Sequence, residues 1–280
     1  MTLELRAERC LVMGIVNRTP DSFYDGGRMG LQESIDYCLA LVEQGADMLD
    51  IGGVKAGPGR DVSEEEEATR LLPVVEKIAA AVEVPLSVET GRPGIARRAV
   101  EAGAEIVNDV SSLSDPDLAG ACAETGAALV LMHNGGQIRG RPRHPVYTDV
   151  VSEVRAEWKR LATVARSAGV PEHRLIADPG LDFGKNTFHS LELMRRLDEL
   201  TAAPYPVLIA PSRKDVVGET LDLPLKERLE GSLALVVLCA AGGAALVRVH
   251  DVAESVRAVR MVESVLGSRA PAAPVRGLWE

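Results

Sequence analysis

The chain has 280 residues, of which 46% are apolar and 26% are charged, and its formal net charge is −10. This balance argues against a disordered protein, and the length suits one large α/β domain. No block of Lys and Arg interrupts the acidic composition. A generally anionic surface repels nucleic acid and acidic membranes, so we expect neither as a partner.

The cysteines of the chain are widely spaced and form no CxxC pair, a pattern that predicts neither a disulfide framework nor a zinc site. They stand at Cys10, Cys38, Cys122 and Cys239. A reducing cytoplasm is the simplest setting for such thiols, and we therefore expect a cytoplasmic protein. The longest apolar run, Leu233 to Val247, is too short for a membrane span and is broken by Gly242 and Gly243.

Short apolar runs rich in β-branched residues alternate with longer helical stretches along the whole chain. The runs cover residues 11–16, 48–53, 85–90, 105–110, 128–133, 175–180, 206–212 and 244–251. Eight such runs are the number that a closed (β/α)8 barrel requires. We predict a single α/β domain of this kind, a TIM barrel over residues 1–267, followed by a loose Pro- and Ala-rich tail at 268–280.

The stretches between the runs have the patterns of amphipathic helices. The first opens near Gly30 and closes at Gly45, and the second follows Ser63, a good N-cap residue. The acidic run Glu64 to Glu67 complements the dipole of that second helix, so we interpret it as a solvated helix start rather than a metal site. Further helices are expected at 93–102, 116–125, 148–168, 190–200, 225–241 and 253–266.

Polar residues collect where the predicted strands end. In a barrel these carboxyl ends converge on one mouth, where active sites of the fold lie, whereas an open doubly wound sheet would not readily predict the pattern. The residues are Asn17, Gly52, Gly53, Glu89, Asn108, His133, Asp178, Ser212 to Lys214, Arg248 and His250.

Six motifs in order resemble those of the dihydropteroate synthases, over roughly residues 11–267. They are MGIVNRTPDSFYDGG from Met13, DIGG from Asp50, the block at 86–112, DPGLDFGK from Asp178, PSRK from Pro211 and RVHD from Arg248. The family condenses a dihydropterin diphosphate with p-aminobenzoate and releases pyrophosphate in a Mg²⁺-dependent step. The resemblance therefore implies pterin and pyrophosphate-type ligands, Mg²⁺ as cofactor, and a homodimer formed through outer helices, for which the apolar helix of Cys239 is a candidate.

For the pterin slot, the resemblance points to Glu89, Asn108 and Asp178, with Lys214 at the edge. A pterin ring presents amide-like donors and acceptors, which carboxylates and carboxamides can match. Glu89 stands where the family has Asp. The additional methylene moves the carboxylate by roughly an ångström, enough to disturb a two-point hydrogen bond.

For the leaving group, the resemblance points to Asn17, Arg248 and His250, with Asn17 as a ligand of the Mg²⁺ that bridges the pyrophosphate. Arg248 and His250 are two residues apart on one strand, so their side chains share a face. Together with Lys214, we expect them to act in catalysis by absorbing the developing charge. Arg213 comes from an adjacent loop and could either join this anion site or form a surface salt bridge.

The main departure from the family follows the second strand. Val54, Lys55, Ala56 and Gly57 stand where the family has Glu-Ser-Thr-Arg, so a hydroxyl and a guanidinium are missing. Losing one preorganised donor to a transition state costs on the order of a hundredfold in rate. Lys55 cannot reproduce the planar fork of an arginine.

Two other loops also differ from the family. Asn134 and Gly135 replace Met and Arg, and Asp215 and Val216 replace Ser and a bulky apolar residue. An added carboxylate near the anion and p-aminobenzoate sites is unfavourable for negatively charged substrates.

Three functions follow from the sequence. The first is a dihydropteroate synthase-like protein that keeps much of the pterin and pyrophosphate pocket but has impaired or absent condensation. The second is an active synthase that tolerates the changes, and the third is a non-catalytic pterin-binding or regulatory scaffold. A pterin-dependent methyltransferase is disfavoured, because a methyl-transfer site has no pyrophosphate for Asn17, Arg248 and His250 to hold.

Overall fold

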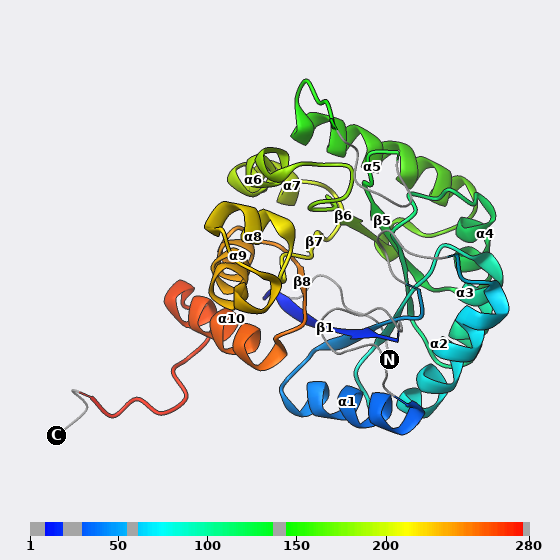
Figure 1. The fold of residues 1–280 in the computed structure, drawn as a ribbon, viewed down its shortest axis with the longest axis horizontal. Helices are drawn as coiled ribbons and strands as arrows, with labels where there is room; N and C mark the ends of the chain where they lie inside the picture. Colours follow the sequence, from blue (N-terminus) through cyan, green and yellow to red (C-terminus); the bar gives the residue numbers. More distant parts are fainter. Residues whose placement is uncertain (1–8, 19–29, 55–60, 137–143, 277–280) are drawn as a thin grey trace.

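The computed structural model describes residues 9–18, 30–54, 61–136 and 144–276. Eight parallel strands curl around a central axis and the helices surround them (Figure 1). The sheet order is β6-β5-β4-β3-β2-β1-β8-β7. An isolated parallel bridge between Ala177 and Val207 joins the two ends, supported by the Ala177 amide, which donates to the Pro206 carbonyl at 2.9 Å. The predicted TIM barrel is confirmed.

The strands are short, and each has a neighbouring strand on both sides. Their bounds are β1 Leu11–Asn17, β2 Met48–Gly52, β3 Leu86–Glu89, β4 Ile106–Asp109, β5 Ala128–Met132, β6 Leu175–Asp178, β7 Leu208–Ile209 and β8 Leu246–Val249. Seven of them lie inside their predicted apolar runs, and β1 extends one residue beyond its run to Asn17. The run at 206–212 gives only two strand residues, because β7 has a regular ladder with β8 alone and meets β6 through the single bridge.

The helices follow the strands on the outside. They are α1 Leu31–Glu43, α2 Glu64–Ala79, α3 Pro93–Glu101, α4 Asp117–Thr125, α5 Val150–Ser167, α6 Thr187–Arg195, α7 Leu197–Thr201, α8 Asp215–Leu221, α9 Leu229–Ala241 and α10 Val252–Leu266, with 3-10 turns at Glu172–Arg174 and Leu225–Glu227.

Two helix predictions need correction. The helix predicted at 190–200 is two helices, which meet at Arg196, where the backbone leaves the helical region with ψ at 37°. Helix α8 was not predicted, because its seven residues directly follow the PSRK motif and are too few for a clear periodic pattern.

The strands bury side chains on both faces, with a period of two residues. Alternate residues point outward to the helices, as Leu49, Ile51, Leu86 and Val88 do in the larger core cluster. The remaining positions fill the barrel lumen with a second apolar cluster, which consists of Leu11, Met13, Met48, Ile106, Ala128, Val130, Ile176, Leu208, Ala210 and Leu246. This cluster fills the lumen below the mouth, where active sites of the fold lie.

The start of α2 was interpreted as solvated, which is right in part. The hydroxyl of Ser63 accepts from the Glu66 amide and caps the helix, as predicted. Glu67, however, is buried: the Thr90 hydroxyl donates to one carboxylate oxygen at 2.6 Å and Arg92 to the other at 2.7 Å. Its side chain faces β3 across the helix–sheet interface, which the local sequence does not reveal.

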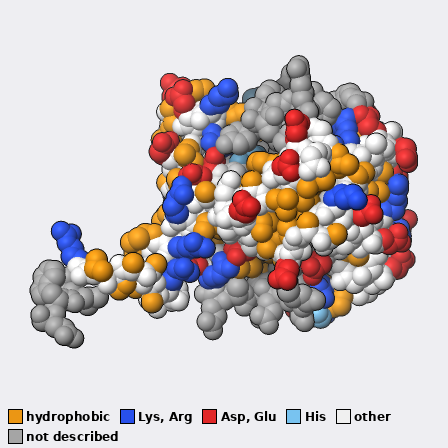
Figure 2. Space-filling model, turned by 90° about the horizontal axis from the view of Figure 1, so that it is seen from below, with side chains coloured by type: hydrophobic (Ala, Val, Ile, Leu, Met, Phe, Trp, Pro, Cys, Tyr) orange, Lys and Arg blue, Asp and Glu red, His pale blue; other side chains and the backbone are white. Residues whose placement is uncertain are grey.

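The surface mixes apolar and charged side chains on the face that Figure 2 shows. Residues 268–276 are exposed and run away from the barrel (Figure 1). Among the described helices, none combines the length and the apolar character needed to cross a membrane.

Trp158 on α5 links the helical layer to the sheet and is 1% exposed. Its indole N–H donates at 3.0 Å to the Asp178 carbonyl, which also accepts from the His133 amide at 3.0 Å. We predict that Trp158→Ala lowers the free energy of unfolding by about 3–5 kcal/mol through the cavity it leaves. Trp158→Phe, which mainly loses the hydrogen bond, costs about 1 kcal/mol.

Urea unfolding measures both values. Phe188→Ala, at a side chain that is 79% exposed, is the control, and its change stays within about 0.5 kcal/mol. Equal costs for Trp158→Ala and Phe188→Ala would contradict the assigned packing.

Candidate functional site

The inward positions become polar toward the mouth of the barrel. Asp50, Glu89, Asn108, Asp178 and Arg248 each continue the alternation that places the lumen cluster below them. All five belong to strands, so the rigid ladder fixes their backbones: Gly52 pairs with Glu89, and Glu89 with Asn108. The sequence predicted four of these residues, but it assigned no role to Asp50.

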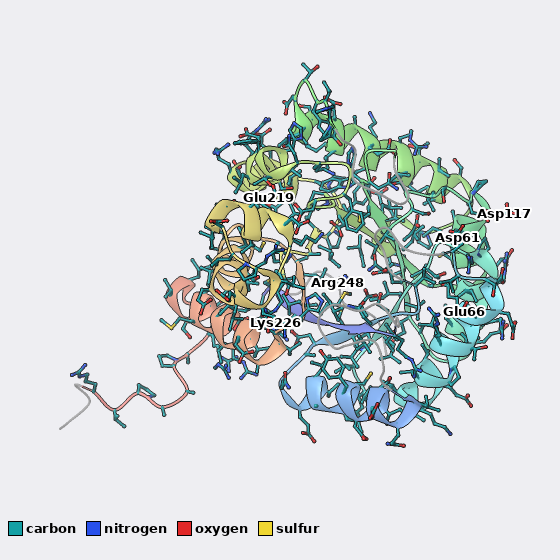
Figure 3. All side chains as sticks on the ribbon, in the orientation of Figure 1. Asp61, Glu66, Asp117, Glu219, Lys226 and Arg248 are labelled. Atoms are coloured by element: carbon teal, nitrogen blue, oxygen red, sulfur yellow. The ribbon has the colours of Figure 1, made fainter. Side chains whose placement is uncertain are left out.

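Arg248 lies at the centre of this polar layer, and Figure 3 labels it in the middle of the barrel. Its Nε donates to Asp50 Oδ2 at 2.5 Å and its Nη2 donates to Glu89 Oε2 at 2.6 Å. Asn108 Nδ2 donates to the same Asp50 oxygen at 2.9 Å. Two carboxylates from neighbouring strands thus hold the guanidinium that the sequence assigned to the leaving group.

Acceptor atoms remain unused in this layer. Within the described residues, Asp50 Oδ1, Asn108 Oδ1 and Ser87 Oγ are buried and have no hydrogen-bond partner. Leaving a buried polar atom unpaired costs about 1–3 kcal/mol, so most such atoms in proteins have a hydrogen-bond partner. Their position in the lumen makes them natural acceptors for the donors of an entering ligand.

The surroundings of the slot raise the pKa values of its carboxylates. Burial raises the pKa of Glu89 to about 7, with Asp50 adding to the rise and Arg248 opposing it. Burial also raises the pKa of Asp178, against the attraction of Lys214. One oxygen of Asp178 accepts from the Gly180 amide at 2.7 Å, which orients the side chain.

Lys214 lies at the edge of the slot, between carbonyl and aromatic partners. Its ammonium donates to the Leu181 carbonyl at 2.6 Å and is 4.7 Å from the centre of the Phe183 ring. Burial lowers its pKa, while Asp182 and Asp178 oppose that change. The charges of Asp178, Arg248 and Glu89 all act on Lys214, which shows that the structure brings these predicted residues together.

His250 follows Arg248 on the same inward face. Its Nδ1 is 3.1 Å from Ser212 Oγ, and that hydroxyl also accepts from the His250 amide at 3.2 Å. Burial lowers the pKa of His250 to about 4, and the charge of Arg248 acts in the same direction. The imidazole is therefore neutral at pH 7.

The sequence left two alternatives for Arg213, an anion site or a surface salt bridge, and among the described residues the structure shows no surface salt bridge for it. This side chain is buried, and its Nε and Nη2 donate to the two carboxylate oxygens of Asp251 at 2.8 and 2.7 Å. Its Nη1 donates to the Leu225 and Lys226 carbonyls. This two-point pair fixes the loop after β7 against the end of β8.

A second buried cation was missed by the sequence analysis. Lys185 is 4% exposed, and its ammonium donates to the carbonyls of His133, Gly180 and Phe183 and contacts His133 Nδ1 at 2.8 Å. Burial lowers the pKa of Lys185 to about 7 and that of His133 to about 4. The lysine ties the loop after β6 to the end of β5.

Asn17 ends β1 on the inward face and is partly buried. Its amide oxygen is a hard donor of the kind that Mg²⁺ prefers, and Mg²⁺ needs few protein ligands when phosphate oxygens complete its shell. The described residues contain no group of three or more His, Cys, Asp or Glu side chains suited to a metal. Asn17 offers one oxygen donor of the kind predicted to hold Mg²⁺, while Thr19 to Gly27 of its motif lie outside the described residues.

The positions that differ from the family pattern lie partly inside and partly outside the described residues. Val54 is described, whereas Lys55, Ala56 and Gly57 lie outside the described residues. Gly53, which precedes them, is fixed through its carbonyl by Arg70 Nη1 at 3.0 Å. Asp215 is paired with Arg228 at 2.9 Å, which offsets the negative charge that was expected to disfavour anionic substrates.

The loop after β5 is compact. Asn134 is buried, and its side chain binds the Val110 carbonyl and the Gly136 amide. Gly135 has a φ of +67°, and a Cβ there would be 2.8 Å from the Tyr147 hydroxyl and 3.0 Å from Gly184 Cα. A larger residue at position 135 would need a different loop path, so this segment cannot present the family's side chain.

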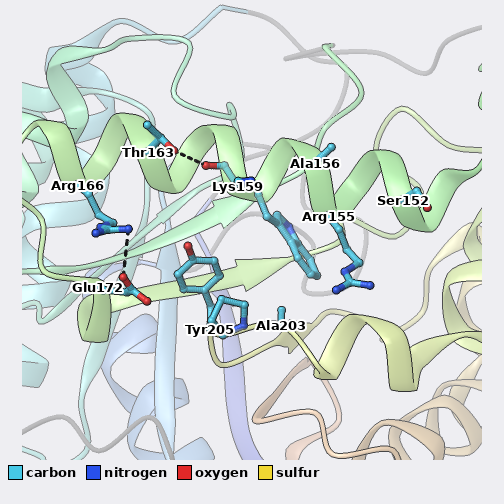
Figure 4. Close-up of a pocket in the computed structure, with 11 residues that line it drawn as sticks. Ser152, Arg155, Ala156, Lys159, Thr163, Arg166, Glu172, Ala203 and Tyr205 are labelled. Atoms are coloured by element: carbon cyan, nitrogen blue, oxygen red, sulfur yellow. Dashed lines mark hydrogen bonds and ion pairs between the residues drawn. The ribbon is translucent and has the colours of Figure 1, made fainter.

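A cavity of about 660 Å³ lies away from the mouth, between α5 and the segment before β7. Figure 4 shows Arg155 and Tyr205 extending from its opposite walls, and Arg166 paired with Glu172. None of the sequence-predicted site residues lines it. It is distinct from the polar layer.

A TIM barrel whose plugged lumen carries buried carboxylates, an amide and cations at its mouth defines a class of protein with a small-molecule site. A family model described as "Pterin binding enzyme" matches residues 13–250. The inactive dihydropteroate synthase 2 of Mycobacterium leprae (strain TN) is 45% identical over 279 residues, which cover 97% of this chain and 96% of that protein.

The dihydropteroate synthase of Escherichia coli (strain K12) is 42% identical over 260 residues, which cover 92% of each chain. The crystal structure of the Yersinia pestis dihydropteroate synthase in complex with a sulfonamide drug has a TM-score of 0.91 and 38% identity, and the match covers 96% of this chain and 97% of that one. The chain belongs to the dihydropteroate synthase family of pterin-binding enzymes.

We predict that the His250 imidazole titrates near pH 4 in the ligand-free protein. Because the folded pKa lies below the unfolded value of about 6.5, protonation favours the unfolded state, and this residue's contribution to stability falls as the pH drops from about 6.5 to about 4. Glu89 acts in the opposite direction between about pH 4.5 and 7, so bulk stability alone would mix the two effects.

Nitrogen-15 NMR of the imidazole resolves His250 alone, with His250→Asn used for assignment. A midpoint near 6.5 would show that the ring is solvated and contradict the burial described above.

Proposed function

We propose that this protein binds a pterin ring at the mouth of the barrel and that its condensation of dihydropterin diphosphate with p-aminobenzoate is impaired or absent. The observation that carries the proposal is the position of Arg248. The guanidinium that a departing pyrophosphate requires is held by Asp50 and Glu89, and Glu89 is the residue that departs from the family.

The pterin half of the proposal rests on matched hydrogen-bonding groups. Asp178 and Glu89 offer carboxylates to ring N–H donors, Asn108 offers an unused carbonyl oxygen, and Lys214 offers a donor at the edge. The dry surroundings that raise the carboxylate pKa values also strengthen hydrogen bonds to a bound ring. One carboxylate oxygen of Glu89 already accepts from Arg248, which leaves the other oxygen for a donor of the ring.

The leaving-group half rests on Asn17, Arg248 and His250. Mg²⁺, held by Asn17, would supply charge neutralisation of the diphosphate when bound. The carboxylates of Asp50 and Glu89 offset the charge of Arg248, and a neutral His250 contributes hydrogen bonding but no charge. Each of these conditions reduces the stabilisation of the departing pyrophosphate.

The amine-acceptor side lacks the family's hydroxyl and guanidinium at Val54 to Gly57, and the glycine at position 135 presents no side chain. Two missing donors, each worth about a hundredfold, account for a loss of turnover of roughly 10⁴-fold. An active synthase and a regulatory scaffold that binds neither ligand are the competing functions that the next experiment separates.

We predict that the protein binds 6-hydroxymethylpterin in calorimetry but releases pyrophosphate from its diphosphate at least about 10³-fold more slowly than an active synthase of the family. Asp178→Asn weakens pterin binding by roughly tenfold or more, because a charge-assisted hydrogen bond is worth about 1.5–3 kcal/mol. The conservative change Glu157→Gln, on the outer helix α5, leaves binding unchanged. Turnover at the rate of an active synthase would contradict the impaired site, and absence of pterin binding would support the scaffold.

We further propose a homodimer in a reducing cytoplasm. All four cysteines are buried free thiols, and burial raises the pKa of Cys10, Cys38 and Cys122 to about 12, so they are protected from oxidation. Cys239 itself faces the barrel, but its helix α9 and the adjoining α10 expose Val237, Leu238, Met261, Val265 and Leu266.

This exposed set is the proposed dimer face. We predict that Leu238→Glu shifts the mass measured by light scattering from dimer to monomer, whereas Val146→Glu, at an exposed position away from α9 and α10, does not. A monomeric unsubstituted protein would contradict the dimer.

A further inference from the structure

We propose that Lys185 is a positioning residue, which holds Lys214 in place for a bound pterin by fixing the loop between Gly180 and Phe183. This inference rests on the proposed function, because a pterin is the ligand that Lys214 would contact. Lys185 is only 4% exposed, so it acts through the groups that it binds.

The loop after β6 binds two ammonium groups, and its successive carbonyl oxygens serve one or the other. The Gly180 and Phe183 carbonyls accept from Lys185 at 3.1 and 2.9 Å. The Leu181 carbonyl, which lies between them in the chain, accepts from Lys214 at 2.6 Å. The two lysines therefore share the loop but no acceptor, and the backbone path that Lys185 fixes determines where the Leu181 carbonyl lies.

The backbone of this loop has a conformation that needs support from outside. Gly180, Asp182 and Gly184 have φ values of 64°, 66° and 59°, which lie in the left-handed region. Residues with a Cβ seldom adopt this region, and Asp182 is such a residue. The loop therefore depends on contacts that favour this particular path.

The Lys185 ammonium provides such contacts, because it carries three N–H groups. In addition to the two carbonyls of the loop, the His133 carbonyl accepts from it at 3.1 Å, and His133 Nδ1 is 2.8 Å away. His133 directly follows strand β5, so these contacts tie the loop to the barrel wall. An ammonium between converging carbonyl oxygens also offsets their mutual repulsion.

Phe183 links the loop to Lys214 a second time. Its ring centre is 4.7 Å from the Lys214 ammonium, a distance typical of a cation–π contact. The Asp182 side chain ties the middle of the loop to α6 and α8, whereas Lys185 binds the carbonyls on both sides of that middle. Without Lys185, we expect the Leu181 carbonyl and the Phe183 ring to move away from Lys214, which then loses both groups that hold it at the edge of the slot.

The first test measures the Kd of 6-hydroxymethylpterin for the full chain by calorimetry. We expect Lys185→Met and Lys214→Met each to raise this Kd roughly tenfold or more, because each removes the charge-assisted donor at the edge of the slot. In the double variant the Kd stays within about twofold of that of Lys214→Met, because both changes remove the same contact. Lys185→Gln, which keeps neutral N–H donors, raises the Kd less than Lys185→Met and replaces it if that variant does not fold.

Proton NMR of the Lys214 side chain tests the same inference without a ligand. In the unsubstituted protein the Phe183 ring shifts the Hε signals of Lys214 upfield, since the ammonium lies over the ring. Lys185→Met removes this ring-current shift, as Phe183→Leu does, and Lys214→Arg assigns the signals. A role of Lys185 that is limited to the stability of the folded chain leaves the signals in place.

Glu67→Gln is the matched control, since Glu67 is a buried, hydrogen-bonded group that lies outside the lumen. In this variant the pterin Kd and the Lys214 signals equal those of the unsubstituted protein. The inference is overturned if Lys185→Met leaves the Lys214 signals in place, or if the effects of Lys185→Met and Lys214→Met on the Kd multiply. Failure of the pterin to bind the unsubstituted protein instead overturns the proposed function, and the NMR signals then still decide the role of Lys185.

Discussion

Arg248 carries a charge that no accessible pH removes, and the fold places it in the lumen of the barrel. A buried cation must be paired or it destabilises the protein by several kcal/mol. The strands on one side meet this need with Asp50 and Glu89, which both point inward and accept from the guanidinium. The rest of the site depends on that requirement, since groups that neutralise Arg248 are also groups that a ligand would use.

Under the proposed function, this arrangement allows the protein to retain the motifs of its family while its condensation chemistry differs. Asn108, Asp178 and Lys214 are held by short contacts that leave acceptors and a donor facing the slot. Glu89 occupies the same place as the family's shorter acid, but its length allows it to reach across to Arg248. The change therefore affects the leaving-group side, although it lies in the pterin side of the site.

The sequence predicted the barrel well because periodicity is local information. Alternating apolar runs and the caps at Ser63 and Gly45 depend on neighbours within a few residues, and the structure confirms both. The convergence of Glu89, Asp178, Lys214 and Arg248 was also predictable, because in a barrel all strands end at one mouth. Asp50 could have been recognised as well, since a carboxylate inside a fully buried strand is rare without a partner.

The sequence could not predict which of these residues pair with one another. Arg248 and its two carboxylates are separated by 198 and 159 positions, so their contact depends on side-chain directions across the assembled barrel. The same holds for Arg213, which pairs with Asp251. It also holds for Glu67, which was predicted to be solvated because it belongs to an acidic run. One-dimensional patterns identify which face a residue occupies, but not which of several nearby charges it binds.

Nitrogen-15 NMR of the Arg248 side chain, assigned with Arg248→Lys, tests the central claim most directly. A guanidinium held through Nε by Asp50 and through Nη2 by Glu89 gives a slowly exchanging Nε–H signal and separate Nη signals, because rotation about Cζ–Nε is blocked. In Glu89→Asp the Nε–H signal persists while the Nη signals merge. A single averaged Nη signal and a rapidly exchanging Nε–H in the ligand-free protein would contradict the account.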